Sequence, residues 1–193
     1  MKIAIILPDG AADEPLAALA GRTPLEAANI PNMDWVARHG ALGRAVTVPD
    51  GYTPATDVAT MSVFGYDPDQ HYTGRAPIEA AAQGLSVGDN ELIFRCNFVT
   101  IVNGRMQSFT ADHIRQDEAD ALIAALNELI AADDAAVRGC RFHTGVSYRN
   151  LMIVDGAGEI ALTTKAPHDI PDQPVAEYLP HGRGAERVLG IME

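Results

Sequence analysis

The chain has 193 residues, and its 14 Lys and Arg against 26 Asp and Glu give a net charge of -12. A hydrophobic fraction of 47% with 21% charged residues is ordinary for a globular protein and excludes a disordered acidic tail. The acidity argues against nucleic acid and anionic membranes as partners, because both are bound through basic surfaces. An anionic substrate would need a local group of Arg side chains or metal ions.

The amino-terminal part has the alternating pattern of an α/β protein. The apolar run 2–7 predicts a strand buried on both faces of a mostly parallel sheet. A helix is predicted from Pro31 to Gly40, followed by a short strand over 45–48. A further helix is predicted to open at Thr56 and to end before Gly65. Together these elements predict half of an α/β sheet.

The pattern changes after Gly84 to that of a smaller α+β unit. We therefore expect two domains, residues 1–84 and residues 85–193. In the second domain, Asn103-Gly104 is a strong hairpin signal, and an Ala-rich helix is predicted over 116–132, with Leu122 and Ile123 on its apolar face. The other expected elements are strands at 92–99, 141–143 and 151–154 and a helix from 184 onward.

Targeting and redox signals are weak in this sequence. Cys96 and Cys140 are too few and too far apart for a disulfide scaffold or a zinc knuckle. The apolar run near the amino terminus is too short for a signal peptide, and no run approaches the roughly 18 residues that cross a bilayer. We expect a cytoplasmic protein.

Two positions are suited to phosphoryl chemistry. Asp9 follows the first predicted strand, at the sheet edge where α/β proteins bind ligands, and its carboxylate suits a divalent cation. The alternative is that Pro8-Asp9-Gly10 is an ordinary turn. Thr56 has a hydroxyl at a helix amino terminus, where a phosphate is favoured and where a bound metal would activate the hydroxyl as a nucleophile. The alternative is a helix-capping threonine.

Several longer motifs resemble those of the archaeal-type 2,3-bisphosphoglycerate-independent phosphoglycerate mutases, which belong to the alkaline phosphatase superfamily of metalloenzymes. The resemblance covers nearly the whole chain and is densest in its first hundred residues. The motifs are Asp9-Gly10, the stretch from Thr23 to Asp34, Thr56-Asp57 with Met61 to Pro68, Gly74-Arg75 with Glu79-Ala80, and Arg95-x-Asn97-Phe98.

This resemblance implies a fold, two cofactor ions and a set of site residues. The fold would be part of an alkaline-phosphatase-like, mostly parallel sheet domain, carrying an inserted α+β domain that caps the substrate. Asp9 and Thr56 would bind one or both of two divalent metal ions (Mn, Mg or Zn), and no bisphosphoglycerate would be needed. Thr56 would take the phosphoryl group of 3-phosphoglycerate and return it to give 2-phosphoglycerate. Substrate binding would fall to Asp57, Arg75 and Arg149. His113 and His168 are further substrate-binding candidates that the family motifs do not include.

Two of these assignments have simpler alternatives. Arg149 matches an Arg of the family pattern, and the alternative is that it is a solvent-exposed strand residue without a role in binding. His168 with Asp169 is a substrate or acid/base pair in one interpretation, and a loop histidine held by its neighbour in the other.

The chain also departs from the family pattern. It lacks the Asp-x-x-x-His-Asp and Asp-His metal motifs, so we interpret it as an amino-terminal portion that is inactive alone. An Arg-rich stretch of the family is replaced by Ser108 to His113, which contains no Arg. One alternative is therefore a metal-dependent phosphotransferase or phosphatase acting on another phosphomonoester or phosphonate. The other is a non-catalytic stand-alone domain, whose exposed half-sheet should form a homo-oligomer.

Overall fold

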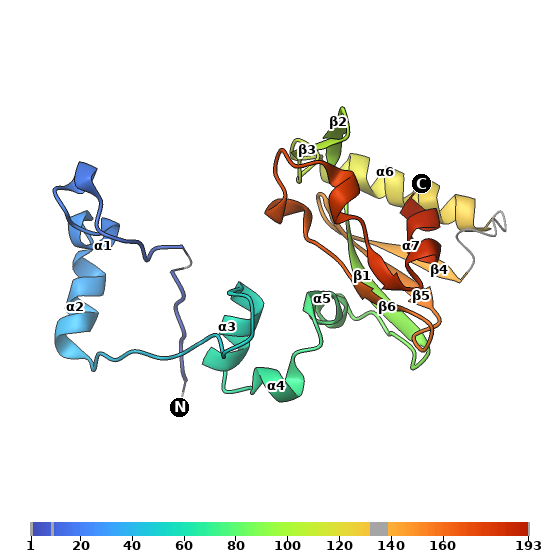
Figure 1. Ribbon diagram of the computed structural model, residues 1–193. Coiled ribbons are helices and arrows are strands. Elements are labelled where there is room, and N and C mark those ends of the chain that lie inside the picture. The colour runs from blue at the N-terminus through green and yellow to red at the C-terminus, as the bar shows by residue number, and fades with distance from the viewer. Residues whose placement is uncertain (1, 9, 132–138, 193) are drawn as a thin grey trace. The chain divides into compact units, whose positions relative to one another are not determined.

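The computed structural model describes residues 2–8, 10–131 and 139–192. The chain divides into two compact units, Met1–Ala55 and Thr56–Glu193 (Figure 1). The domain boundary expected after Gly84 stays a prediction.

The first unit contains short helices. They are η1 (Ala17–Leu19), α1 (Pro24–Ala27) and α2 (Pro31–His39). Helix α1 begins with a capping box, in which the Glu26 N–H donates to Thr23 Oγ1 and the Thr23 N–H donates to the Glu26 carboxylate, at 3.2 and 2.8 Å. Helix α2 has Pro at its first position and ends before Gly40, which confirms the predicted helix.

The strands predicted at 2–7 and 45–48 are not formed, and this part of the prediction is wrong for this structure. Among the described residues, neither run pairs with another strand. The side chains of Ile6 and Val46 are 86% and 87% exposed. A continuous apolar run indicates a preference for burial, but a strand also needs neighbours that satisfy its backbone N–H and C=O groups.

The second unit carries antiparallel sheets. The central one has three strands in the order β1 (Glu91–Asn97), β5 (Arg149–Asp155) and β4 (Cys140–Val146), and both pairings are antiparallel. The hairpin predicted at Asn103-Gly104 is confirmed: both residues have positive φ, 51° and 75°, and join β2 (Thr100–Val102) to β3 (Arg105–Ser108). The described chain is thus mixed α/β with antiparallel sheets.

Helices and a second hairpin complete this unit. The long helix α6 (Gln116–Ala131) confirms the Ala-rich prediction up to the limit of the described residues. The remaining elements are α3 (Thr56–Val63), α4 (Pro68–His71), α5 (Arg75–Ala82), β6 (Ala161–Thr163), η2 (Pro167–Asp169), η3 (Val175–Tyr178), β7 (His181–Arg183) and α7 (Ala185–Met192). Within the described part of the chain, no helix has both the length and the apolar character needed to cross a membrane.

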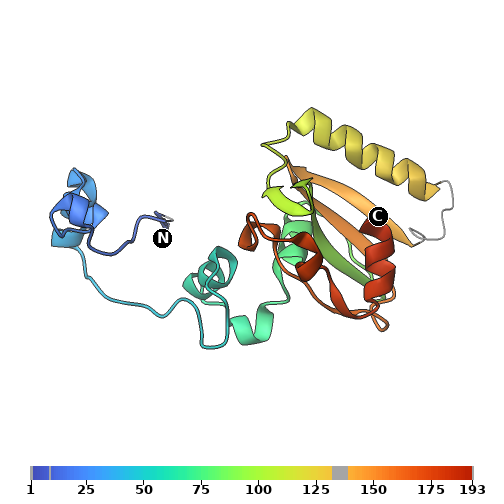
Figure 2. The ribbon, with the colours of Figure 1, turned by 45° about the horizontal axis from the view of Figure 1, so that its top comes forward.

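The three-stranded sheet is packed on both faces (Figure 1 and Figure 2). Side chains alternate along a strand, so Leu151 of β5 packs on Ala76 and Ala80 of α5. Its neighbour Met152 joins the other cluster, which α6 and α7 cover with Ile123 and Val188. Strand β5 is therefore the centre of two small cores.

The two cysteines lie in the core between the sheet and helices α6 and α7. Cys140 is buried and Cys96 packs against the same cluster. Burial in apolar surroundings disfavours the thiolate and raises the pKa of each thiol to about 11.

An ion pair joins the outer strands of this sheet across its α5 face. Both terminal nitrogens of the Arg141 guanidinium group on β4 donate hydrogen bonds to the Glu91 carboxylate on β1. The bond from Nη2 to Oε2 is 2.9 Å long. The hydrogen bonds from Arg141, helped by the Gly88 backbone N–H, lower the pKa of Glu91 from 4.5 to about 2.

This ion pair predicts acid sensitivity. A carboxyl whose pKa is lower in the folded state stabilises the fold above its unfolded pKa, and this stabilisation is lost as the pH falls from about 5 toward 2. The Glu91→Gln variant should therefore show a lower urea midpoint than the wild type at pH 7, with the difference shrinking as the pH falls. The exposed Glu128→Gln variant is the control. A constant Glu91→Gln deficit from pH 7 to pH 2 would contradict the prediction.

Candidate functional site

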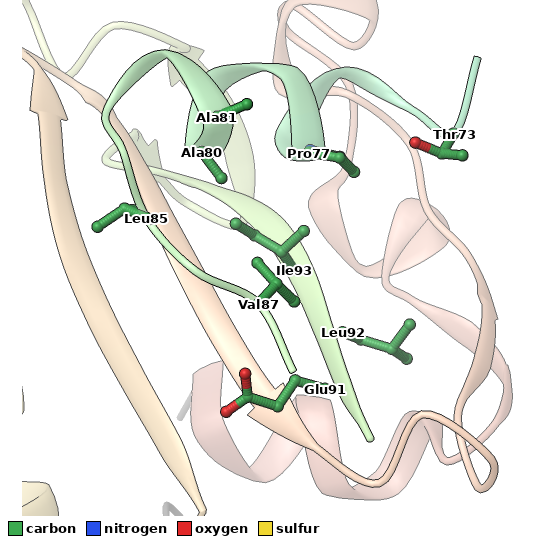
Figure 3. Close-up of a pocket in the computed structure, with 9 residues that line it drawn as sticks. All are labelled: Thr73, Pro77, Ala80, Ala81, Leu85, Val87, Glu91, Leu92 and Ile93. Atoms are coloured by element: carbon green, nitrogen blue, oxygen red, sulfur yellow. The ribbon is translucent and has the colours of Figure 1, made fainter. Parts of the chain in front are cut away.

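Two cavities of different character lie in the described part of the second unit. One, of about 400 Å³, lies between α5 and β1, and Figure 3 shows Ala80 of the helix and Ile93 of the strand pointing toward one another. Hydrocarbon dominates this lining and Glu91 supplies its charge, so it does not suit an anion.

The other cavity is rich in cationic and aromatic side chains. Its volume is about 310 Å³. It is built from α5, β1, the segment after β3, the β4–β5 turn and η2, which are far apart in the sequence. Its lining residues are Arg75, Arg95, Asn97, Phe109, Tyr148, Arg149 and His168. We take it as the candidate functional site.

One carboxylate holds two of the three arginines. Glu79 of α5 lies 3.6 Å from Arg75 Nε and 3.3 Å from Arg95 Nε. The Arg95 side chain is only 19% exposed, so this charge is largely removed from solvent. Three guanidinium groups against one carboxylate leave the cavity positive, and guanidinium forks match carboxylate and phosphate oxygens.

The third arginine stacks on its neighbour. The Arg149 guanidinium carbon is 5.0 Å from the centre of the Tyr148 ring, and Arg149 Nε donates to the Tyr148 hydroxyl at 3.1 Å. Such contacts restrict a long side chain before any ligand arrives.

Hydrogen bonds from two side chains hold the turn before Arg149 in place. The buried Asn150 accepts from the Gly145 N–H at 3.1 Å and donates to the Tyr148 carbonyl at 3.3 Å. From α6, Gln116 donates to the Gly145 carbonyl at 3.2 Å and accepts from the Ser147 N–H at 2.8 Å. The core therefore fixes the place where Tyr148 and Arg149 enter the cavity.

His168 lines the cavity and lies next to a carboxylate. Its ring lies edge-on to Phe109 with centroids 6.3 Å apart, at the cavity. Its Nε2 is also 3.6 Å from a carboxylate oxygen of Asp169. The imidazole thus lies at the candidate site beside a carboxylate.

Three other predicted residues do not line this cavity. Thr56 is exposed as the first residue of α3, and Asp57 accepts hydrogen bonds from the Tyr72 hydroxyl at 2.7 Å and the Val58 N–H at 3.0 Å. His113 is exposed in the turn before α6. Asp9 lies outside the described residues, so its predicted metal role stays a prediction.

A metal site can be searched for only in the described chain. Among residues 2–8, 10–131 and 139–192, no group of three or more His, Cys, Asp or Glu side chains is placed to hold an ion. A two-metal centre needs several oxygen or nitrogen ligands for each ion, so these residues do not form one by themselves.

The sequence of this chain matches a family of known proteins. Residues 37–193 match the sequence model of the family described as 2,3-bisphosphoglycerate-independent phosphoglycerate mutase. The chain belongs to this family. It is 45% identical to the phosphoglycerate mutase of this name from Methanothrix thermoacetophila, over 100% of this chain and 47% of the relative. It is 44% identical to a probable one from Geobacter sulfurreducens, over 100% of this chain and 48% of the relative.

The phosphoglycerate mutase relatives are longer proteins. This chain spans about half the length of the curated relatives it matches. A solved structure of a protein from Pyrococcus horikoshii is also similar, with 33% identity and a TM-score of 0.57, over 76% of this chain and 35% of that one.

Sequence reasoning missed part of the lining of the cavity. In the sequence, Arg95 and Asn97 stand out only as part of a family motif, and no pattern marks Phe109 or Tyr148 as site residues. Side chains alternate between the two faces of a strand, so the sequence indicates that Arg95 and Asn97 of β1 lie on the same face. The register that sets Asn97 opposite Arg149 comes only from the structure.

A strained turn carries Phe109 to the cavity. Ala111, Asp112 and His113 have φ of 48°, 53° and 60°, in the left-handed region that non-glycine residues avoid. Ser108 Oγ accepts from the Asp112 N–H at 2.9 Å, and the Thr110 carbonyl accepts from the His113 N–H at 3.0 Å. Local hydrogen bonds therefore hold a turn that the backbone alone disfavours.

The strain in this turn predicts that an Ala→Gly substitution stabilises the protein there, whereas the same substitution in a helix destabilises it. Ala111→Gly should stabilise the protein by up to about 1 kcal/mol, because glycine adopts positive φ without a Cβ clash. Ala124→Gly, on the exposed side of α6, should destabilise it by about 1 kcal/mol. Urea unfolding of both variants checks this. Equal destabilisation by the two changes would show that the turn is not strained.

Proposed function

We propose that this chain provides the substrate-binding part of a phosphoglycerate mutase that interconverts 3-phosphoglycerate and 2-phosphoglycerate without bisphosphoglycerate. The observation that carries the proposal is the cavity where Arg75, Arg95 and Arg149 converge, in a chain that belongs to this family. The longer relatives are named as phosphoglycerate mutases, and the enzymatic activity proposed here is the one that those names state.

The chemistry of phosphoglycerate supports this assignment. The molecule carries a phosphate and a carboxylate, so a site for it needs several cations within a few ångströms. On a protein with a net charge of -12, a cavity lined by three guanidinium groups is an unusual local reversal of sign. Each guanidinium can donate two parallel hydrogen bonds to one anionic group.

The reacting hydroxyl in this proposal is that of Thr56. The phosphoryl group passes from the 3-oxygen of phosphoglycerate to Thr56 Oγ1, and the proton of the Thr56 hydroxyl passes to the 3-oxygen of the glycerate that leaves. The 2-hydroxyl of glycerate then takes the phosphoryl group back, and its proton returns to Thr56 Oγ1. Thr56 is exposed at the start of α3, where backbone N–H groups favour a phosphate, and this supports the role.

Two finer features belong to the same proposal. The first is a pair of divalent metal ions, Mn, Mg or Zn, with Asp9 and Thr56 among their ligands. The second is an alkaline-phosphatase-like, mostly parallel sheet domain of which this chain forms a part, in a cytoplasmic enzyme. Because the described residues do not form a metal centre, we expect this chain to bind phosphoglycerate without converting it.

The arginine cavity predicts a charge-specific loss of binding. In calorimetric titrations of the 193-residue chain with 3-phosphoglycerate, Arg149→Ala should weaken binding about 10- to 100-fold, because a charge-assisted hydrogen bond contributes about 1.5–3 kcal/mol. Arg38→Ala is the matched control, since it removes the same charge from an exposed position on α2. Equal losses in the two variants, or no binding by the wild type, would refute the proposal.

A second substrate class has one observation in its favour. The segment from Ser108 to His113 contains no Arg where the family pattern has several. The same titration with other phosphomonoesters and phosphonates separates the two candidates. Tighter binding of one of these than of phosphoglycerate would favour the related phosphotransferase or phosphatase.

A further inference from the structure

Two buried polar atoms at the candidate site have no hydrogen-bond partner among the described residues. They are Arg95 Nε and Asn97 Oδ1. Both side chains line the cationic cavity, and both belong to β1, two residues apart on the same face. Arg95 Nε lies 3.3 Å from Glu79, but this is a charge contact without hydrogen-bond geometry.

Unpaired buried polar atoms are rare in folded proteins because each one loses its hydrogen bonds to water without replacement. Here two of them belong to residues that are two apart on one strand and line one cavity. The third such atom of the described chain, His143 Nε2, belongs to a residue that does not line this cavity. The coincidence of two unpaired atoms with a ligand-sized cavity indicates that a ligand group pairs with them.

One of the two atoms is a hydrogen-bond donor and the other an acceptor, and this restricts the chemistry of the ligand group that can pair with both. Arg95 Nε–H can only donate and Asn97 Oδ1 can only accept. A carboxylate or phosphate oxygen accepts, so it would satisfy the arginine and leave the amide oxygen unpaired. A hydroxyl group accepts through its lone pairs and donates through its hydrogen, so it satisfies both.

We propose that Arg95 and Asn97 together bind a hydroxyl group of the ligand, so that the site selects hydroxylated phosphocarboxylates over their deoxy analogues. This inference rests on the proposed function. The register of the sheet sets Asn97 opposite Arg149, so the hydroxyl would bind next to an arginine suited to an anionic group. Asn97 is then a specificity residue, and the guanidinium groups supply the charge.

The test compares two ligands that differ only in this hydroxyl. Calorimetric titration of the 193-residue wild-type chain with 2-phosphoglycerate and with 2-phospholactate, which lacks the 3-hydroxyl, should show about tenfold tighter binding of the hydroxylated ligand. The Asn97→Leu variant should bind 2-phospholactate about as well as the wild type and lose the preference. In nitrogen-resolved NMR spectra of the wild type, the Asn97 side-chain amide should shift with 2-phosphoglycerate and not with 2-phospholactate, a readout that requires no variant.

The outcomes separate this inference from the proposed function. Equal wild-type affinity for both ligands would overturn the hydroxyl assignment, since water would then serve the two atoms equally well, and would leave the anion site standing. A preference that survives in Asn97→Leu would overturn the role of Asn97. Failure of the wild type to bind either ligand would overturn the anion site itself, and the inference with it.

Discussion

Strand β5 has neighbours on both edges and packed helices on both faces, and the second unit is organised around it. Leu151 and Ile153 point toward α5, whereas Met152 points toward α6 and α7. A shift of one residue in its pairing would exchange these faces, so the buried side chains fix the register strongly. The same register determines that Arg95 and Asn97 of β1 reach the cavity, and the candidate site therefore depends on the core.

The cavity also shows how an acidic protein gathers positive charge. Three guanidinium groups near one another repel, and burial of one of them adds a desolvation cost. Glu79 offsets part of this cost by lying within 3.6 Å of both Arg75 and Arg95. An arriving anion must compete with that carboxylate for the arginines, so Glu79 keeps the cationic side chains ordered while it moderates how tightly they hold a ligand.

Local signals predicted most of the second unit, because a turn or an amphipathic helix is specified by residues close in sequence. The Asn103-Gly104 hairpin is an example, and Ile123 is buried as its helical position predicts. Leu122, predicted on the same apolar face, is 46% exposed, since the sheet covers a narrower stripe than the periodicity suggests. The runs 2–7 and 45–48 failed as strands because pairing is not local. The candidate site was predictable only in part. Arg75 and Arg149 came from family resemblance and His168 from its position next to Asp169, whereas the partners on β1 required the sheet register.

The two protected thiols have a practical consequence for spectroscopy. At neutral pH a thiol with a pKa of about 11 is almost entirely protonated, and both Cys96 and Cys140 pack inside the core. Thiolates are the nucleophiles that attack maleimide reagents, so a cysteine introduced at an exposed position would react far faster than either native one. Fluorophores or spin labels could thus be attached singly to this protein without first removing its own cysteines.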